Sequence, residues 1–297
     1  MPEPSTTAPP PPRLFCFGLG YSARALPAAL LAEGWSVAGT CRTEEKRAAL
    51  AAQGFDVFLF DRGRPLADTA GALQGATHLL SSVPPDETGD PVIYHHGPDI
   101  AGLKTLRWAG YLSTTGVYGD RDGGWVDEQA ERQPSGRRGR RRVAAEDAWT
   151  DLWLTHGVPV HLFRLAGIYG PGRNALETVR QGRARRIVKP DQVFSRIHVD
   201  DIAAVLRASM AAPHPGTAYN VCDDEAAPPD VVIAHACTLL GVAPPPEEPF
   251  ETAEMSEMAR SFYADNKRVS NRRIKEELGV SLACPDYRAG LEKLLKD

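Results

Sequence analysis

Short apolar runs and longer amphipathic segments alternate along most of the chain. The apolar runs have the length and composition that are typical of buried strands. They occur at 14–17, 35–40, 55–61, 78–81, 108–114, 159–170 and 217–223. Helical patterns lie at 22–33, 44–53, 143–153 and 266–279, and residues 196–210 combine a short strand with a helix.

Strands that alternate with helices imply a parallel sheet with helices on both of its faces. We therefore predict an α/β fold of the Rossmann type, a doubly wound parallel sheet with a small carboxy-terminal substrate region. The sheet domain would comprise 13–168 plus 196–222, and the smaller region 169–195 plus 223–297. Residues 1–12, MPEPSTTAPPPP, are predicted to form a disordered proline-rich tail.

Composition and charge argue against several classes of protein. A formal net charge of -4 argues against a protein that its overall field holds to nucleic acid. The segment ALPAALLA is far shorter than a membrane-spanning helix, and the first residues lack the pattern of a signal peptide. The five cysteines form no C-x-x-C pair, so we expect reduced thiols in the cytoplasm and no metal site.

The first strand–helix turn, GLGYSA at 18–23, fits the pattern G-x-G-x-x-A. In this pattern the first glycine permits a tight turn and the second lets the backbone approach a pyrophosphate. The small last residue lets helix and strand pack closely, and the phosphates bind at the positive end of the helix. The predicted dinucleotide contacts are Gly18, Gly20, Tyr21, Ser22 and Ala23, and a merely structural turn is the alternative.

The end of the second strand selects between the two nicotinamide dinucleotides. NAD-binding folds usually place an acidic residue there, but this strand ends at Arg42. A guanidinium suits the 2′-phosphate of NADP, so we expect NADP rather than NAD as the cofactor. The alternative is a solvated Arg42, with Glu44 or Glu45 holding the ribose. Asp61, which ends the third strand, is expected near the adenine, with a helix cap as its alternative role.

Five segments together resemble a known protein family. GLGYSA, STTGVYGD, FRLAGIYGPGR, RIHVDDIA and AYNVCDDE are similar to segments of the extended short-chain dehydrogenase/reductases. Relatives in that family include nucleotide-sugar epimerases and dehydratases, and members often pair through helices into dimers. The resemblance covers nearly the whole chain after the tail. The form G-x-G-x-x-A, rather than G-x-x-G-x-x-G, points to the family's atypical branches.

The resemblance implies a hydroxyl residue and a Y-x-x-x-K pair at the reaction centre. The hydroxyl lies four residues before the tyrosine of VYG, so it belongs to Thr114, which would orient the substrate. The pair should lie on the next long helix, with its lysine four residues before a glutamate. Counting back from Glu146 puts Arg142 at the lysine position and Arg138 at the tyrosine position.

This replacement changes the chemistry that the resemblance implies. The family's tyrosine passes a proton, and its lysine lowers the tyrosine pKa and holds the nicotinamide ribose. Arg142 still supplies positive charge near the ribose. Arg138 stays protonated at any working pH, so it can polarise a carbonyl or bind an anionic substrate but cannot exchange a proton. The alternatives are a solvated basic loop with a shifted register and a patch for nucleic acid.

The resemblance also implies contacts at the ends of other strands. The cofactor crevice would be lined by Ser81, Val83, Ser113, Arg142, Leu165 and Gly167, and the substrate would contact Tyr118, Tyr169 and Arg173. The alternative is that these segments only form the loops after the strands and contact neither cofactor nor substrate. RIHVDD is expected to tie the substrate region to the core. The Y-x-x-x-K string from Tyr263 to Lys267 lies too far along the chain to be the catalytic pair.

Two functions remain open from the sequence. The first is an NADP-dependent oxidoreductase or epimerase/dehydratase-type enzyme that acts on a sugar-like or carbonyl substrate. Its proton donor would be nonstandard, either a water molecule or another tyrosine. The second is a catalytically silent NADP-binding sensor or partner-binding protein. The missing tyrosine supports the second function, and the retained segments STTGVYG and GIYGPG support the first.

Overall fold

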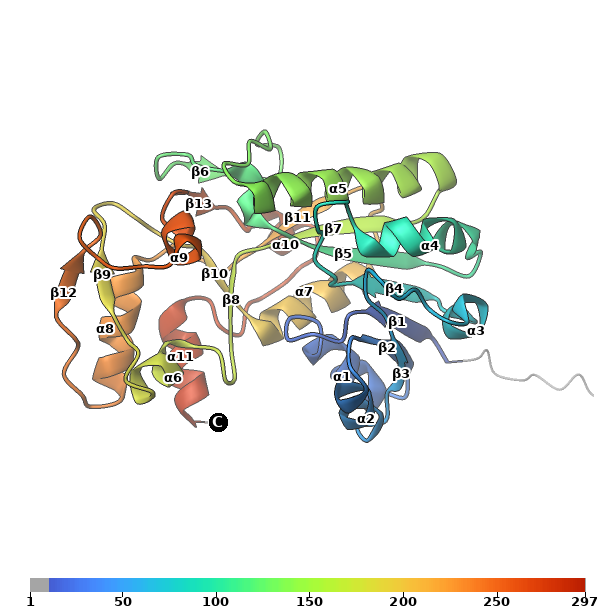
Figure 1. Cartoon of the computed structure of the whole chain (residues 1–297), viewed down its shortest axis with the longest axis horizontal. Helices are drawn as coiled ribbons and strands as arrows, with labels where there is room; N and C mark the ends of the chain where they lie inside the picture. Colours follow the sequence, from blue (N-terminus) through green and yellow to red (C-terminus); the bar gives the residue numbers. More distant parts are fainter. Residues whose placement is uncertain (1–10, 297) are drawn as a thin grey trace, which may run out of the picture.

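The computed structural model describes residues 11–296, and a seven-stranded parallel sheet forms the centre of this part of the chain (Figure 1). The strands lie in the order β11-β7-β5-β4-β1-β2-β3, and every neighbouring pair is parallel. Their bounds are β1 Arg13–Phe17, β2 Ser36–Cys41, β3 Asp56–Leu59, β4 His78–Ser81, β5 Trp108–Thr114, β7 Val160–Leu165 and β11 Ala218–Val221. The predicted doubly wound Rossmann-type sheet is confirmed.

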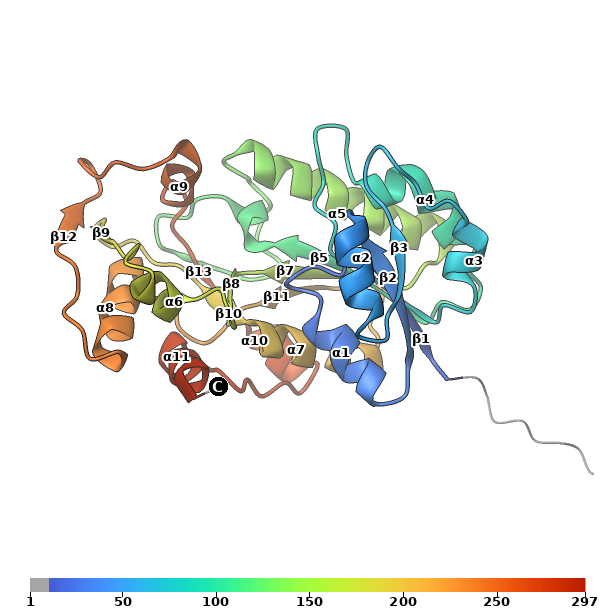
Figure 2. The same ribbon diagram turned by 60° about the horizontal axis from the view of Figure 1, so that its bottom comes forward.

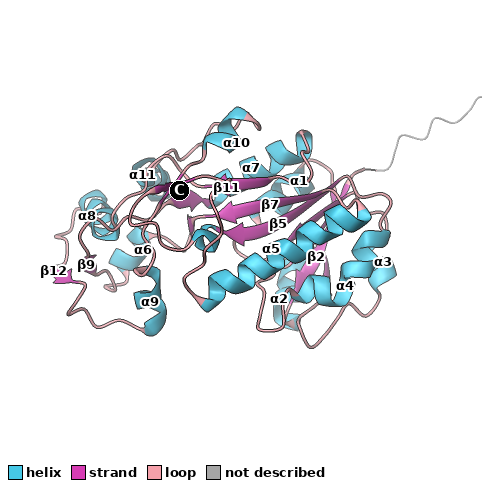
Figure 3. Ribbon diagram, turned by 90° about the horizontal axis from the view of Figure 1, so that it is seen from above, coloured by secondary structure: helices cyan, strands magenta, loops and turns pink. Residues whose placement is uncertain are grey.

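Helices cover both faces of the sheet (Figure 1, Figure 3). One face carries α1 Ala25–Ala32 and α7 Val199–Ala211; the other carries α3 Thr69–Leu73, α4 Pro91–Gly102 and α5 Arg137–His156, and α2 Glu44–Ala51 lies beside β2 and β3. Side chains of β1 alternate between the faces. Leu14 and Cys16 join the core beneath α1 and α7, whereas Phe15 and Phe17 join the core beneath α3, α4 and α5. Burial on both faces explains why this strand is apolar from Leu14 to Phe17.

A smaller group of elements lies at the end toward which the arrows of the sheet strands point (Figure 2, Figure 3). Its helices are α6 Ala175–Arg180, α8 Pro229–Leu239, α9 Glu257–Phe262 and α11 Tyr287–Lys296. Short parallel pairs join β8 Gly167–Tyr169 to β10 Arg196–His198, β9 Arg186–Val188 to β12 Glu247–Pro249, and β6 Trp125–Val126 to β13 Arg268–Val269. The short helices η1 Thr115–Tyr118 and α10 Arg272–Glu276 complete the chain. Ligands of such folds bind beside the carboxyl ends of the strands, which face this group.

Several predicted boundaries are corrected. α1 begins at Ala25 rather than at residue 22, because residues 21–24 form a turn after the glycines. α5 begins at Arg137 rather than at residue 143, so the arginine run belongs to the helix and is not a loop ahead of it. Arginine is a good helix former, although the apolar pattern begins only at residue 143. The run 159–170 splits into β7 and β8, and 266–279 holds β13 and α10 in place of one helix.

Other elements have no counterpart in the sequence analysis. These are α3, α4, α6, α8, α9, α11, β6, β9 and β12. Of the predicted tail, residues 1–10 lie outside the described residues, while the Pro12 carbonyl accepts a hydrogen bond from the Ser36 amide at 3.1 Å. The domain boundaries remain a prediction. Across residues 11–296, each helix is too short or too polar to cross a membrane.

Candidate active site

The glycine loop, residues 18–23, follows β1 at the carboxyl edge of the sheet. Gly18 has a φ of +86°, its amide donates to Thr40 Oγ1 at 2.8 Å, and its carbonyl accepts from Ser82 Oγ at 2.5 Å. A Cβ on Gly18 would lie 2.8 Å from Ser82 Oγ, so glycine is required there. Ala23 is fully buried against the sheet. The loop is thus held from β2 and from the residue after β4.

The same loop leaves backbone donors for a ligand. The amide of Gly20 donates to the Gly18 carbonyl at 2.7 Å. Within the part of the chain that the structure describes, the amides of Tyr21, Ser22 and Ala23 donate no hydrogen bond. A Cβ on Gly20 would make ordinary van der Waals contacts, 3.8 Å from Ser82 Oγ and 3.9 Å from the Gly18 carbonyl, so packing within the chain does not itself require glycine there. Consecutive free amides ahead of a helix suit the pyrophosphate of a dinucleotide.

Two guanidinium groups lie at the ends of β2 and β3. Arg42 is exposed, and its carbonyl accepts from Arg64 Nη2 at 2.6 Å. Arg64 also bonds Asp61 Oδ2 at 2.9 Å, which puts the Asp61 carboxylate in a tight turn rather than in a helix cap. Glu44, the alternative ribose ligand, is paired with Arg47 at 2.8 Å. The sequence analysis missed Arg64, although the turn DRGR after the third strand could have indicated it.

The serines at the ends of β4 and β5 differ in burial and in hydrogen-bond partners. Ser81 is fully buried and Ser113 is 4% exposed, with its hydroxyl donating to Glu146 Oε1 at 2.6 Å. Because both side chains are buried, contacts of Ser81 and Ser113 with the cofactor would be made by their backbone atoms, and these contacts remain a prediction. Val83 is half-buried and Gly167 exposed, whereas Leu165 is buried. Ser82 is the serine that contacts the glycine loop.

The beginning of α5 lies against the end of β5. Arg142 Nη1 donates to Tyr111 Oη at 2.9 Å and to the Leu112 carbonyl at 2.7 Å. A Cβ on Gly139 would lie 2.8 Å from the Gly116 carbonyl, so only glycine allows this close approach. Thr114 Oγ1 accepts from the Gly116 amide at 3.1 Å, and its own proton has no acceptor among the described residues. Thr114 is thus positioned with a free hydroxyl donor.

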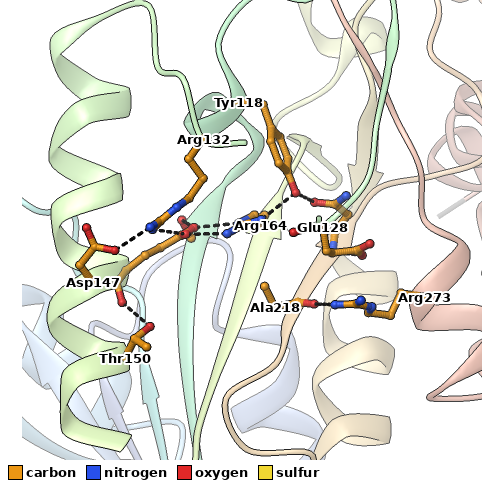
Figure 4. A network of polar contacts seen from close by, with 11 residues as sticks. Tyr118, Glu128, Arg132, Asp147, Thr150, Arg164, Ala218 and Arg273 are labelled. Carbon is orange, nitrogen blue, oxygen red and sulfur yellow. Dashed lines mark hydrogen bonds and ion pairs between the residues drawn. The ribbon is translucent and has the colours of Figure 1, made fainter. Parts of the chain in front are cut away.

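A buried polar network fixes α5 to the sheet (Figure 4). Glu146 is fully buried and accepts four hydrogen bonds, from Ser113 (2.6 Å), Arg164 (3.1 and 2.9 Å) and Arg132 (3.2 Å). Arg132 also bonds Asp147 at 2.7 Å. The carboxylate charge is balanced by two guanidinium groups, which is the condition for burying it without a large penalty. The sequence analysis used Glu146 only as a counting mark and missed Arg132.

Tyr118 belongs to this network (Figure 4). Its ring is fully buried, its hydroxyl donates to Asn220 Oδ1 at 2.7 Å, and it accepts from Arg164 Nη1 at 2.9 Å. Burial raises the pKa of Tyr118 to about 12, although Arg164 opposes the shift. The Tyr118 hydroxyl proton is thus bound by Asn220, which argues against Tyr118 as the missing proton donor, and its contact with the substrate remains a prediction.

The other two predicted substrate residues also differ from expectation. Tyr169 is 8% exposed and its hydroxyl donates to the Asp286 carbonyl at 3.4 Å, while burial raises its pKa. Its ring lines a small cavity of about 120 Å³ between β8, β10 and α11. Arg173 lies over the Tyr21 ring at 5.7 Å, and Tyr21 Oη donates to the Pro171 carbonyl at 3.1 Å. Arg173 therefore lies beside the glycine loop, on the cofactor side rather than in a separate substrate pocket.

Two further sequence features have structural roles. Lys267 Nζ donates to the Gly119 carbonyl at 2.8 Å and pairs with Asp265 at 3.2 Å, so the string from Tyr263 ties loops together. Asp201 accepts from the Ala283 and Cys284 amides at 2.7 and 3.0 Å, which joins α7 to the carboxy-terminal segment. All five cysteines are free and buried. Among the residues described, no cluster of three His, Cys, Asp or Glu side chains is arranged to hold a metal ion.

Comparisons with known proteins agree with this geometry. No family model matches the chain. Protein YeeZ of Escherichia coli K12 is 27% identical over 293 residues, which cover 91% of this chain and 95% of YeeZ. The solved structure of UDP-glucuronic acid 4-epimerase from Bacillus cereus, in complex with UDP-glucuronic acid and NAD, shares the fold. Its TM-score is 0.78 at 16% identity, with 96% of this chain and 98% of that chain covered.

A second solved structure is much more similar in sequence. It is a functionally unknown conserved protein from Silicibacter pomeroyi, with a TM-score of 0.90 and 52% identity. The alignment covers 96% of this chain and 99% of the Silicibacter chain. The chain therefore belongs to the family of this Silicibacter protein, and it shares its fold with UDP-glucuronic acid 4-epimerase from Bacillus cereus.

Proposed function

We propose that this protein is an NADP-dependent oxidoreductase that acts on a hydroxyl or carbonyl group of a small substrate. The observation that carries the proposal is the glycine loop at the carboxyl edge of the sheet, where three consecutive amides, those of residues 21–23, have no hydrogen-bond acceptor among the described residues. This arrangement fits a dinucleotide and has no evident structural purpose of its own. An epimerase or dehydratase reaction uses the same hydride chemistry and remains within the proposal.

The described residues fit NADP at both ends of the crevice. The amides of residues 21–23 would hold the pyrophosphate, with Arg173 beside them. Arg42 and Arg64 would bind the 2′-phosphate, and Asp61 would lie near the adenine. Arg142 uses only Nη1 in its bonds to β5, so Nε and Nη2 remain as donors toward the nicotinamide ribose. The cofactor, when bound in its reduced form NADPH, would supply the hydride that reduces a carbonyl carbon and would leave as NADP+.

Two side chains would act on the substrate. The free hydroxyl of Thr114 would donate a hydrogen bond to the substrate oxygen and so orient the substrate. The Arg138 guanidinium would stabilise negative charge on that oxygen, because a fixed positive charge favours an alkoxide. Arg138 does not release its proton, so the proton that converts the alkoxide to an alcohol would come from water.

The second candidate, a silent NADP-binding sensor, is favoured by one observation. Tyr118 and Tyr111, which lie near the end of β5, are both fully buried. Neither hydroxyl is available as a general acid, and burial raises the pKa of both. If water does not serve as the donor, the chain would bind the cofactor without turnover.

We also propose a cytoplasmic homodimer, in keeping with family members that pair through helices. Tyr94 of α4 and Leu154 of α5 are 67% and 66% exposed, and the two helices pack side by side on one face of the sheet. Large exposed apolar side chains of this kind are common where a second subunit packs. The free cysteines are compatible with a reducing compartment.

The proposal is tested by titrating the purified protein with NADPH and NADH and following nucleotide fluorescence. We expect micromolar affinity for NADPH, and an Arg42→Asp variant should lose its preference over NADH because a carboxylate repels the 2′-phosphate. Arg47→Asp, on the exposed face of α2, is the matched control and should keep the preference. The cofactor assignment fails if neither nucleotide binds at millimolar concentration.

Turnover separates the two candidates. The protein would be mixed with NADPH and a panel of carbonyl compounds and nucleotide sugars, and the decrease in NADPH absorbance recorded. Oxidation with any member supports the enzyme, and a Thr114→Val variant should then reduce kcat more than KM. Firm NADPH binding supports the sensor if there is no NADPH oxidation across the panel and no nucleotide sugar is converted in the presence of NADP+.

A further inference from the structure

The first turns of α5 carry more positive charge than the helix needs. Arg137, Arg138, Arg140 and Arg141 follow Gly136, which provides no side-chain cap, and the first turn contains no acidic residue. Among residues 11–296, only Arg141 of these four has a carboxylate partner, Glu87 Oε1 at 2.6 Å. Positive charges at the positive end of a helix, three and four residues apart, repel one another and the helix dipole. The stability of α5 therefore does not explain this arrangement.

Arg138 lies on the face of α5 that packs against the sheet. Arg138, Arg142, Ala145 and Trp149 are spaced by four, three and four residues, which puts them on one side of a helix. Arg142 bonds β5, and Ala145 and Trp149 are buried. Arg138 shares their side of the helix but is exposed, and its guanidinium makes no hydrogen bond or ion pair with the residues that the structure describes. It is thus free to bind a ligand near the end of β5, against which the first turn of α5 packs.

Gly139 and Arg141 define the surroundings of Arg138. The close approach of Gly139 to the Gly116 carbonyl holds the first turn of α5 against the loop that begins at Thr114. Arg141 reaches Glu87, in the loop that follows β4 and also contains Val83 of the crevice. The Glu87 side chain is 76% exposed, so this ion pair is weak and Arg141 can exchange it for a ligand.

We infer that Arg138 and Arg141 bind an anionic group of the substrate, a carboxylate or a phosphate, whose neighbouring carbonyl or hydroxyl is held by Thr114. This inference rests on the proposed function and specifies its substrate class as acidic carbonyl or hydroxy compounds. Guanidinium groups suit both anions, because their N–H donors match the spacing of two oxygen atoms. Neutral sugars and simple aldehydes would lack the group that these residues recognise.

Anion binding by the intact protein tests the inference without requiring turnover. Inorganic phosphate and oxalate would be titrated by calorimetry at constant ionic strength into the Arg42→Asp protein, in which the cofactor's phosphate site is disabled. We expect at least one of the two anions to bind. The Arg138→Gln substitution should weaken the affinity for that anion at least tenfold. The anion that binds more tightly identifies the substrate's acidic group as phosphate or carboxylate.

Arg140→Gln is the matched control because it removes the same charge from the same helix. Arg140 lies two residues after Arg138, about 200° around the helix axis. Its guanidinium bonds the Ser135 carbonyl at 3.3 Å and no other group among residues 11–296. It should change anion affinity less than twofold, and Arg138→Lys should retain more affinity than Arg138→Gln. Far-ultraviolet circular dichroism of each variant verifies that it is folded.

The outcomes separate this inference from the proposed function. One result is that Arg138→Gln and Arg140→Gln weaken the binding of these anions, or of an oligonucleotide, equally. That result would indicate non-specific electrostatic attraction to the helix and overturn the inference. No anion binding in a protein that binds NADPH when Arg42 is intact overturns the inference and leaves the proposed function standing. Anion binding that depends on Arg138, in a protein that binds no nicotinamide nucleotide, supports the anion site and overturns the proposed function.

Discussion

The glycine loop and the beginning of α5 lie at the same edge of one sheet, yet they retain different parts of the family pattern. The loop keeps its glycines, its small residue and its contacts to β2 and β4. The beginning of α5 packs closely through Gly139 and has the glutamate that the resemblance implies, Glu146, but carries arginines where the resemblance implies tyrosine and lysine. Cofactor binding depends mainly on backbone groups, whereas proton transfer depends on side chains. The residues for proton transfer can therefore change while the loop that binds the cofactor is preserved.

The two regions also differ in how they are stabilised. The glycine loop is held by hydrogen bonds of backbone groups with Thr40 and Ser82. The repulsion within the arginine run of α5 is opposed by the buried network that includes Arg132 and Arg164 (Figure 4) and by the burial of Trp149 in the core. We infer that the network fixes the position of α5 whatever residues occupy its first turns. Three predictions test this difference.

The largest effect is expected from breaking the network. Arg164→Met would leave Glu146 buried with Arg132 as its remaining cationic partner, and it would also remove the donor to Tyr118. Loss of one partner of a buried ion pair costs about 3–5 kcal/mol of stability. Urea denaturation would measure the free energy of unfolding. Arg180→Gln, which breaks an exposed pair with Glu177, is the control and should cost less than about 1 kcal/mol. Similar losses in both variants would contradict the role of the network.

A smaller effect is expected from a methyl group in the glycine loop. Gly18→Ala forces a Cβ to within 2.8 Å of Ser82 Oγ at a positive φ, so the loop must shift away from the pyrophosphate. We expect about a 100-fold loss of NADPH affinity, or about 2.7 kcal/mol, by fluorescence titration. Gly34→Ala has a similar φ of +82° with no atom within 4 Å of the added Cβ. This control should lose stability but retain cofactor affinity, and an equal loss of affinity would count against the loop assignment.

The smallest effect per step of the measurement, one pH unit, concerns a second buried carboxyl, which sharpens the contrast with Glu146. Asp223 follows β11 and is 3% exposed, and burial raises its pKa to about 8 although the Arg196 charge opposes the shift. Between its ordinary pKa of 3.8 and about 8, the folded protein binds a proton that the unfolded chain has released. Stability should therefore decrease as pH rises through this window, by about 1.4 kcal/mol per pH unit.

Asp223→Asn should remove that contribution. Urea denaturation of both proteins at pH 6, 7 and 8 would show stability falling more steeply for the parent than for the variant. A parallel pH dependence would mean that Arg196 compensates the Asp223 charge as fully as the two arginines compensate Glu146.

The sequence by itself determined the sheet, the glycine loop and the positions that diverge from the family pattern. Apolar runs and glycine turns are local signals, since they arise from burial and backbone conformation at single positions. Thus Gly18, Ala23 and Arg42 could be assigned places at the ends of β1 and β2 from the sequence. The beginning of α5 could not, because the apolar pattern starts at residue 143 while arginine's helix propensity extends the helix to Arg137.

Only the tertiary structure decided which polar side chains face the crevice. Ser113, Tyr118 and Tyr169 lie beside strand ends, as predicted, but their hydroxyls bond Glu146, Asn220 and the Asp286 carbonyl. The partners lie 33, 102 and 117 residues away in the sequence. Because a buried polar group must find a hydrogen-bond partner wherever the fold provides one, its direction depends on distant segments that no local pattern contains.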